Sequence, residues 1–287
     1  MTDCPLCGAE FSAPSAACPE CKARSGRPFP LRAPRPARLP HTYDPMTGLV
    51  IVVGVTMLAF ALLPPLTARH SAVSHEQCRN NLKRIGAALH LYHDRYGTFP
   101  PACVTDAGGQ PLYGWRVLIL PFVGEQELFE RFDLSQGWSA PQNRYVLEHL
   151  PDIYRCPSSP TAPADYSTHY AGVCGEGTVL EGTRPVHSLE VRDGLSRTLM
   201  VVEAVNSKFP WTSPQDVDGT MGFRVNTLHG ASSHHAGGAH VLTVDEGVHF
   251  LTDEVAPSIV RQMCHRDDGG GIDVNGPEAM VVRSGAP

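Results

Sequence analysis

Two short cysteine motifs near the start of the sequence have the spacing of metal ligands. Each has the form Cys-Pro-x-Cys, with Cys4 and Cys7 in the first and Cys18 and Cys21 in the second. Two cysteines separated by two residues can aim both thiolates at one ion, and four thiolates make the closed tetrahedral site of structural zinc. The sequence therefore predicts a small zinc ribbon over residues 1–26, with zinc as a structural cofactor.

The ten residues between the two cysteine pairs are fewer than the commonest zinc-binding spacing of about 15–20 residues. They suffice for a minimal hairpin with Phe11 beneath the metal. Because so small a core cannot fold alone, we expect metal binding and folding to be one event. A redox dithiol pair and an exported disulfide are the alternatives. The segment resembles the short zinc ribbons at the N-termini of many bacterial membrane proteins.

A second group of candidate ligands lies near the other end of the chain. Five of the 14 histidines fall within 21 residues: His229, His234, His235, His240 and His249. His235 is followed after nine residues by Asp245. Imidazole and carboxylate suit zinc, nickel or manganese, so a second metal site is one interpretation. The interpretation that we favour is that His235 and Asp245 bond to each other or to the backbone and brace a hairpin.

The charge of the chain divides it into three segments. Residues 1–47 carry six basic and four acidic side chains, residues 48–68 carry none, and residues 69–287 carry 17 basic and 25 acidic ones. The uncharged segment would span about 31 Å as a helix, which matches a hydrocarbon core of about 30 Å. The sequence predicts one transmembrane helix over residues 47–68. A buried core helix and a cleaved signal peptide are the alternatives.

The distribution of basic residues indicates the orientation of this helix. All six basic side chains of the first segment precede it, and several lie in a Pro/Arg-rich linker at 27–46. The positive-inside rule then predicts a cytoplasmic N-terminus and an exported domain at 69–287, in the cytoplasmic (inner) membrane. The linker can also contact anionic lipid weakly.

Apolar residues recur at helical spacing directly after the predicted span. They are Cys78, Leu82, Ile85, Leu89, Tyr92 and Tyr96. This stripe predicts an amphipathic helix that ends at Gly97 and Pro100-Pro101. Four polar residues fall off the stripe, and we expect them to face solvent: His90, His93, Asp94 and Arg95.

Six blocks of the sequence resemble consecutive blocks of one large bacterial family. They are EQCRNNLKRIGAALHLYHDRYGTFPP (76–101), YGWRVLILPFVGEQELFERFD (113–133), YRCPSSP (154–160), DGLSRTLMVVEA (193–204), PWTSPQDV (210–217) and SSHHAGGAHVLTVDEGVHFL (232–251). The family is marked by a prepilin-type processing-associated His-x9-Asp-Gly motif, and its domain has no assigned function. The resemblance covers roughly residues 70–270. It implies an α+β, pilin-like domain, with a long N-terminal helix packed on an antiparallel β-sheet.

The family motif is altered in this chain. His235 and Asp245 match it, but Glu246 stands where the family has glycine. β-rich runs at 239–244 and 248–251 still predict a hairpin around this turn. We expect Gly247 to supply the positive φ one place later, through a bulge.

The resemblance also implies an N-terminal pattern from which this sequence departs. Pseudopilins of the family carry a short basic leader, a glycine at the cleavage site and a glutamate five residues later. Here Gly48 is followed by Val53 at the glutamate position. A buried glutamate is a register signal in filament assembly, so we expect that prepilin peptidase does not cleave the chain and that it is not a major filament subunit.

Five further cysteines lie in the predicted exported domain: Cys78, Cys103, Cys156, Cys174 and Cys264. An oxidising compartment would pair some of them, and the odd number leaves at least one free. Two bridges among five cysteines allow fifteen arrangements. Cys78 can equally be a reduced core residue on the apolar stripe.

These observations favour a single-pass, non-enzymatic, pseudopilin-like envelope protein with a structural or interaction role. Its partners would be the membrane and other envelope or secretion-system proteins. The alternatives are a transmembrane ligand sensor that signals through the zinc ribbon, and a metal-dependent hydrolase that uses His235 and Asp245. The net charge of −6 argues against nucleic-acid binding. No motif identifies a small-molecule substrate.

Overall fold

The computed structural model describes residues 2–3, 10–11, 45–159, 166–269 and 282–283, without the side chains of 2–3, 10–11, 45, 60–74 and 282–283. The chain divides into two units, 1–59 and 60–287. The four predicted zinc ligands lie outside the described residues: Cys4, Cys7, Cys18 and Cys21. The predicted linker up to residue 44 lies outside them as well. Those two predictions therefore stay predictions.

The first unit contains a short hairpin and the start of a long helix. Strands β1 (Thr2–Asp3) and β2 (Glu10–Phe11) pair antiparallel. Helix α1 (Pro45–Tyr96) begins in this unit. Nine large apolar side chains between Met46 and Leu58 are 48–69% exposed.

The predicted membrane segment at 47–68 runs into residues whose side chains are not described. Among the residues that the structure describes, no helix has both the length and the apolar character of a membrane span.

In the second unit, the apolar stripe of α1 is buried as predicted. Cys78, Leu82, Ile85 and Leu89 are fully buried, whereas Tyr92 is half-buried and the last residue of the stripe, Tyr96, is exposed. The helix ends at Tyr96. The following residue, Gly97, has a φ of 81° and donates its N–H to the His93 carbonyl at 2.7 Å, which caps the last turn. The predicted helix end is confirmed.

Two of the four residues that we expected to face solvent do not. The His90 ring nitrogen Nε2 lies 2.6 Å from the Val244 carbonyl oxygen, and the His93 ring packs 4.8 Å from the ring of Phe99. The prediction for these two histidines was wrong because later parts of the chain fold back over this face of α1. Asp94 and Arg95 are exposed, as predicted.

A six-stranded sheet forms the centre of the second unit. Its order is β10 (Val282–Arg283), β9 (Val248–Thr252), β8 (Gly238–Thr243), β6 (Leu199–Glu203), β5 (Tyr170–Cys174) and β7 (Val217–Asp218). Neighbouring strands are antiparallel except β5 and β7, which are parallel. The α+β class is confirmed, but the sheet is mixed rather than purely antiparallel.

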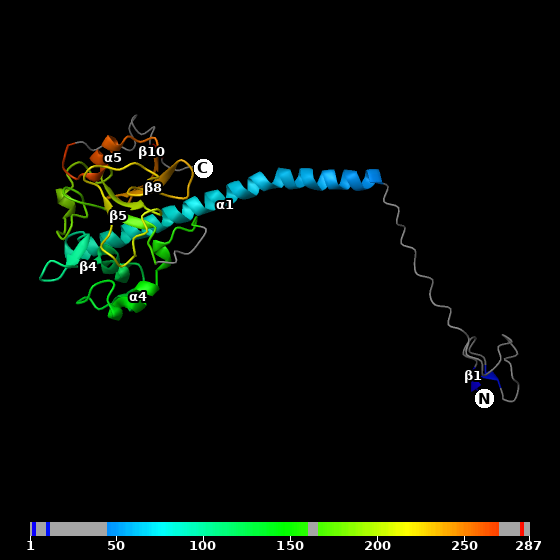
Figure 1. The fold of residues 1–287 in the computed structure, drawn as a ribbon, viewed down its shortest axis with the longest axis horizontal. Coiled ribbons are helices and arrows are strands. Elements are labelled where there is room, and N and C mark those ends of the chain that lie inside the picture. Colours follow the sequence, from blue (N-terminus) through cyan, green and yellow to red (C-terminus); the bar gives the residue numbers. More distant parts are fainter. Residues whose placement is uncertain (1, 4–9, 12–44, 160–165, 270–281, 284–287) are drawn as a thin grey trace. The chain divides into compact units, whose positions relative to one another are not determined.

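Apolar side chains from the sheet pack into two core clusters. Leu242 and Met200 join the buried stripe of α1, whereas Val241 and Val202 join Met263 of α5 (Pro257–Cys264). Successive strand residues point to opposite faces, so the two clusters lie on the two sides of the sheet. In Figure 1, β5 and β8 lie between α5 and the last turns of α1.

Shorter elements lie between α1 and the sheet, and one, η4, lies between β5 and β6. A small hairpin pairs β3 (Cys103–Thr105) with β4 (Pro111–Gly114). The short helices are α2 (Trp115–Leu118), η1 (Leu120–Phe122), α3 (Gln126–Glu130), η2 (Pro141–Asn143), α4 (Arg144–Glu148), η3 (Asp152–Tyr154) and η4 (Ser188–Glu190).

The predicted hairpin is confirmed, but its turn differs from the prediction. Strands β8 and β9 pair from Gly238 to Leu242. The positive φ falls on Glu246, at 66°, and not on Gly247. Asp245 explains this, because its Oδ1 accepts hydrogen bonds from the Thr243 hydroxyl at 2.6 Å and from the Gly247 N–H at 3.1 Å. Gly247 is needed for space, since a Cβ there would lie 2.7 Å from the Thr243 hydroxyl.

Candidate functional site

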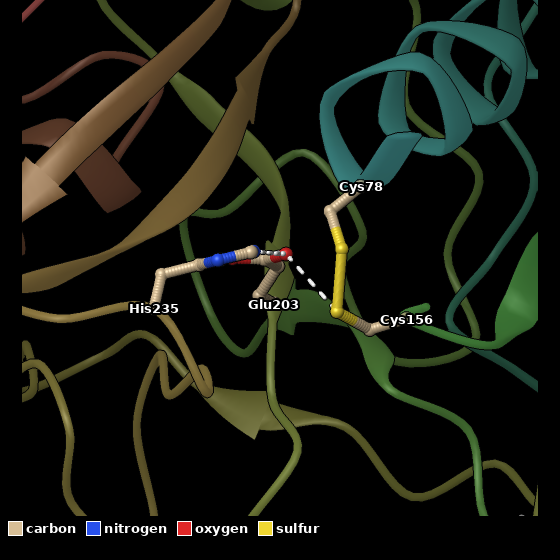
Figure 2. A group of neighbouring side chains, drawn as sticks. All are labelled: Cys78, Cys156, Glu203 and His235. Carbon is tan, nitrogen blue, oxygen red and sulfur yellow. Dashed lines mark hydrogen bonds and ion pairs between the residues drawn. A yellow bond between two sulfur atoms is a disulfide. The ribbon is translucent and has the colours of Figure 1, made fainter. Parts of the chain in front are cut away.

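A buried disulfide joins α1 to the loop that follows η3. Cys78, on the apolar stripe of α1, is bonded to Cys156, and both residues are fully buried (Figure 2). The alternative of a reduced Cys78 was therefore wrong. The other three cysteines of this unit are free thiols: Cys103, Cys174 and Cys264. Only one of the two bridges that we counted as possible is formed.

Polar contacts fix both ends of the disulfide. The Cys156 N–H donates to the His169 ring nitrogen Nδ1 at 2.8 Å. The Asn81 amide donates to the Arg155 carbonyl at 2.9 Å, one turn along α1 from Cys78. These hydrogen bonds hold the YRCPSSP block against α1, and they keep the two sulfur atoms within bonding distance.

A buried carboxylate lies beside the disulfide. Glu203, the last residue of β6, is fully buried, and its Oε1 lies 3.9 Å from the Cys156 sulfur. Its Oε2 accepts a hydrogen bond from the backbone N–H of His240 at 2.7 Å and lies 3.1 Å from Nδ1 of the same ring. Burial raises the pKa of Glu203, but the rings of His235 and His240 lower it by a larger amount, and the net pKa is about 2. The carboxylate is therefore ionised at neutral pH.

His235 approaches the same carboxylate from the segment before β8, as Figure 2 shows. Its side chain is 3% exposed, and its Nε2 lies 3.5 Å from Oε1 of Glu203 without forming a hydrogen bond. Its other ring nitrogen, Nδ1, lies 3.5 Å from the Ser158 hydroxyl. The Ser233 hydroxyl accepts the His235 backbone N–H at 2.9 Å, which fixes the approach of this segment to the strand.

A third histidine completes the cluster from α1. The His75 ring stacks on the His235 ring with centroids 3.7 Å apart, and it meets the His240 ring edge-on at 5.3 Å. Burial, together with the neighbouring rings of His235 and His240, lowers the pKa of His75 to about 4, although Glu203 has an opposing effect. We call these five groups, with the disulfide counted as one, the disulfide–histidine centre: Cys78–Cys156, Glu203, His75, His235 and His240.

The structure separates the two residues of the sequence motif. His235 precedes β8, and Asp245 follows it in the turn. Six strand residues span about 20 Å, so the two side chains lie at opposite ends of the strand. The proposed bond between them therefore does not form, and neither does a shared metal site. Asp245 braces the hairpin turn alone, while His235 belongs to the disulfide–histidine centre.

The histidine cluster seen in the sequence is only partly a cluster in space. His235 and His240 meet, but His229 and His234 are exposed, and His249 lies near Asp245 at the turn. Sequence reasoning missed His75 and Glu203. For Glu203 a signal existed, because it ends the apolar run at 199–202 and every residue of that strand is buried.

The centre offers two overlapping sets of donor atoms. One ligand atom from each of Cys78, Cys156, Glu203 and His235 lies within 4.8 Å of the others, and the same holds for His75, His235 and His240. Sulfur atoms in a disulfide are not thiolates and bind metal poorly. In the oxidised protein the useful donors are therefore imidazole nitrogens and the carboxylate.

A second buried charged centre lies elsewhere in the domain. The Arg116 and Asp216 side chains are both fully buried and form an ion pair of 2.5 Å. The Trp115 indole and the Gly172 N–H also donate to Asp216, at 3.0 and 2.7 Å. The fold thus joins the blocks that contain Trp115-Arg116 and Asp216. We call these residues the arginine–aspartate centre.

Comparison with known proteins places both centres in one family domain. A family described as "Protein of unknown function (DUF1559)" matches residues 75–226 and 208–258. The chain belongs to this family. The DUF1559 match begins at His75 and includes every residue of both centres. No curated protein and no solved structure matches the chain.

Proposed function

We propose that this DUF1559 protein is a non-enzymatic, pseudopilin-like envelope protein, anchored in the cytoplasmic membrane by the first part of α1. The observation that carries the proposal is the exposure of nine large apolar side chains between Met46 and Leu58. An uninterrupted apolar helix surface is costly in water and favourable in lipid. The uncharged sequence of residues 48–68 supports the same interpretation.

The disulfide supports an exported position for the DUF1559 domain. Disulfides form and persist outside the reducing cytosol. The Cys78–Cys156 bond joins the helix to the rest of the domain, so oxidation stabilises the unit as a whole. The fold of a long helix on a sheet accords with the pilin-like layout that the sequence blocks imply.

A structural or interaction role fits the burial of the disulfide–histidine centre away from solvent. The Glu203 side chain has no exposed surface and that of His235 has 3%. An organic substrate would need a pocket open to these groups. We therefore propose other envelope or secretion-system proteins, rather than a small-molecule substrate, as partners.

The N-terminal segment completes the proposal as a cytoplasmic zinc ribbon. Its proposed ligands are Cys4, Cys7, Cys18 and Cys21. The antiparallel pairing of Thr2 with Phe11 on either side of the first cysteine pair supports it. The site would be structural, because four protein ligands leave no open position for a substrate.

Membrane extraction and accessibility in bacterial cells test the anchor. We expect the wild-type chain to sediment with membranes, to resist carbonate extraction and to be cut by external protease after the outer envelope is opened. The variant Met57→Lys/Leu58→Lys should be released into the soluble fraction, because a lysine costs about 2.5–3.5 kcal/mol at the centre of a membrane helix.

Asn80→Lys is the control, because it adds a lysine at an exposed position of α1 inside the domain. It should leave the protein in the membrane fraction. A wild-type chain that is soluble, or whose Cys78 and Cys156 are reduced in cells, would contradict the proposal.

A further inference from the structure

We propose that His75, His235 and His240 bind one divalent transition-metal ion beside the Glu203 carboxylate. This inference does not depend on the membrane anchor, since all four residues belong to the DUF1559 domain. Asp245 is not a ligand of this proposed site, because it lies at the other end of β8.

Two buried nitrogen atoms of the centre have no hydrogen-bond partner. They are Nδ1 of His75 and Nε2 of His235. Buried polar atoms in folded proteins are almost always bonded, and an unbonded one costs about 1–3 kcal/mol. A metal ion bound by both atoms would remove this cost at both positions.

The donor atoms are close enough to reach one ion after small movements of the rings. One nitrogen from each of the three rings lies within 4.8 Å of the others. Tetrahedral ligands at about 2.0–2.1 Å from zinc lie about 3.4 Å apart. Nε2 of His235 and Oε1 of Glu203 are 3.5 Å apart, which is too long for a good hydrogen bond but close to that ligand separation. His75 is only partly buried, so its ring has room to move inward.

Contacts around the rings orient the nitrogen atoms toward the ion. Nδ1 of His240 is engaged in a 3.1 Å contact with Oε2 of Glu203, which leaves Nε2 of that ring as the nitrogen that can reach the ion. Such carboxylate–histidine pairs are the usual support of metal-binding imidazoles. The Ser158 hydroxyl lies near Nδ1 of His235 and leaves its Nε2 for the metal.

The donor set indicates the class of metal. Three imidazoles with one carboxylate suit zinc, nickel or copper better than magnesium or calcium, which prefer oxygen ligands. The sulfur atoms of Cys78 and Cys156 are tied up in the disulfide. The site that we propose is therefore a nitrogen–oxygen site of the oxidised protein.

Zinc titration of the full-length, oxidised chain in detergent tests this proposal. The protein is first stripped with a chelator, and bound zinc is then counted by elemental analysis after dialysis. We expect His235→Ala to bind one zinc ion fewer per chain than the wild type. His234→Ala, the adjacent exposed histidine, should bind as many as the wild type. Any zinc bound by the N-terminal cysteines is the same in all three proteins and cancels.

His75→Gln keeps the test valid if His235→Ala fails to fold. His75 is only partly buried at the surface of α1, and its substitution should weaken zinc binding at least tenfold while the domain stays folded. The zinc-dependent rise in the thermal unfolding midpoint measures this loss, because a ligand that binds only the folded state stabilises it by an amount that grows with the logarithm of its affinity.

Two outcomes would overturn the proposal. One is equal zinc content and equal zinc-dependent stabilisation in the wild type, His75→Gln and His235→Ala. The other is zinc uptake that appears only after the disulfide is reduced, since that would assign the ion to the thiolates of Cys78 and Cys156, with Glu203 and His235.

Discussion

The two buried charged centres of the DUF1559 domain differ in how completely their polar atoms are bonded. In the arginine–aspartate centre, the Arg116 guanidinium donates to Asp216 and to the carbonyls of Trp211, Ser213 and Gln215. In the disulfide–histidine centre, two buried ring nitrogens have no hydrogen-bond partner: Nδ1 of His75 and Nε2 of His235. A closed network of this kind stabilises a fold, whereas an open one has the capacity to take up a ligand. Burial of charge alone therefore does not distinguish structure from function.

The largest effect should follow from breaking the closed centre. Asp216→Ala leaves the Arg116 guanidinium buried without its counter-charge, and arginine cannot release its proton. We expect a loss of about 3–5 kcal/mol in the free energy of unfolding, measured by urea denaturation. Asp218→Ala, at an exposed position two residues later, is the control and should cost about 1 kcal/mol or less. A loss below about 1 kcal/mol for Asp216→Ala would remove the distinction between the centres.

A smaller effect is expected when Glu203, the carboxylate of the disulfide–histidine centre, is replaced. Glu203→Gln should cost about 2–3 kcal/mol at neutral pH in the presence of a chelator, because a neutral amide accepts the His240 backbone N–H more weakly than the carboxylate does, whereas no guanidinium is left without its counter-charge. Urea denaturation at several pH values checks this.

The pH dependence of this change has a definite sign. The folded pKa of Glu203 is about 2, below the value of about 4.3 in an unfolded chain. Between these values the unfolded chain binds more protons, so stability falls as the pH falls from about 4.3 to 2. Above that window the contribution is complete. Glu203→Gln should lack this decrease, and an unchanged acid profile would show that Glu203 is not the group responsible.

The smallest effect should come from the loosest contact of the open centre. The Ser158 hydroxyl lies 3.5 Å from the His235 ring, so Ser158→Ala should change the free energy of unfolding by less than about 0.5 kcal/mol. Ser233→Ala is the matched control. Its hydroxyl accepts the His235 N–H at 2.9 Å and donates to the Gly238 carbonyl at 2.6 Å, so its loss should cost about 1 kcal/mol. Equal costs for both variants would mean that the centre is bonded more tightly than its distances indicate.

Features set by local periodicity could be predicted from the sequence. The stripe from Cys78 to Leu89 and the hairpin of β8 and β9 follow from spacing within a few residues, and both are confirmed. The positive φ of Glu246 was missed, because it depends on where the Asp245 carboxylate finds its donors. Spacing predicts an element more readily than the conformation of each residue in it.

The disulfide–histidine centre could not be assembled from the sequence, because its members come from four distant segments. Glu203 and His240 lie 37 residues apart and meet only when β6 pairs with β8. The nine-residue spacing of the family motif had the opposite effect. It drew attention to His235 and Asp245 as a pair, although an extended strand holds them apart.

The position of the disulfide has a mechanical consequence. Cys78 and Cys156 close a loop with a sequence separation of 78, so a pulling force that enters the domain along α1 passes through a covalent bond to Cys156. The chain between them, which would stretch to about 270 Å if extended, carries none of that force. Tension therefore reaches the residues after Cys156 first. The loop between the two cysteines can extend under force only after the disulfide is reduced.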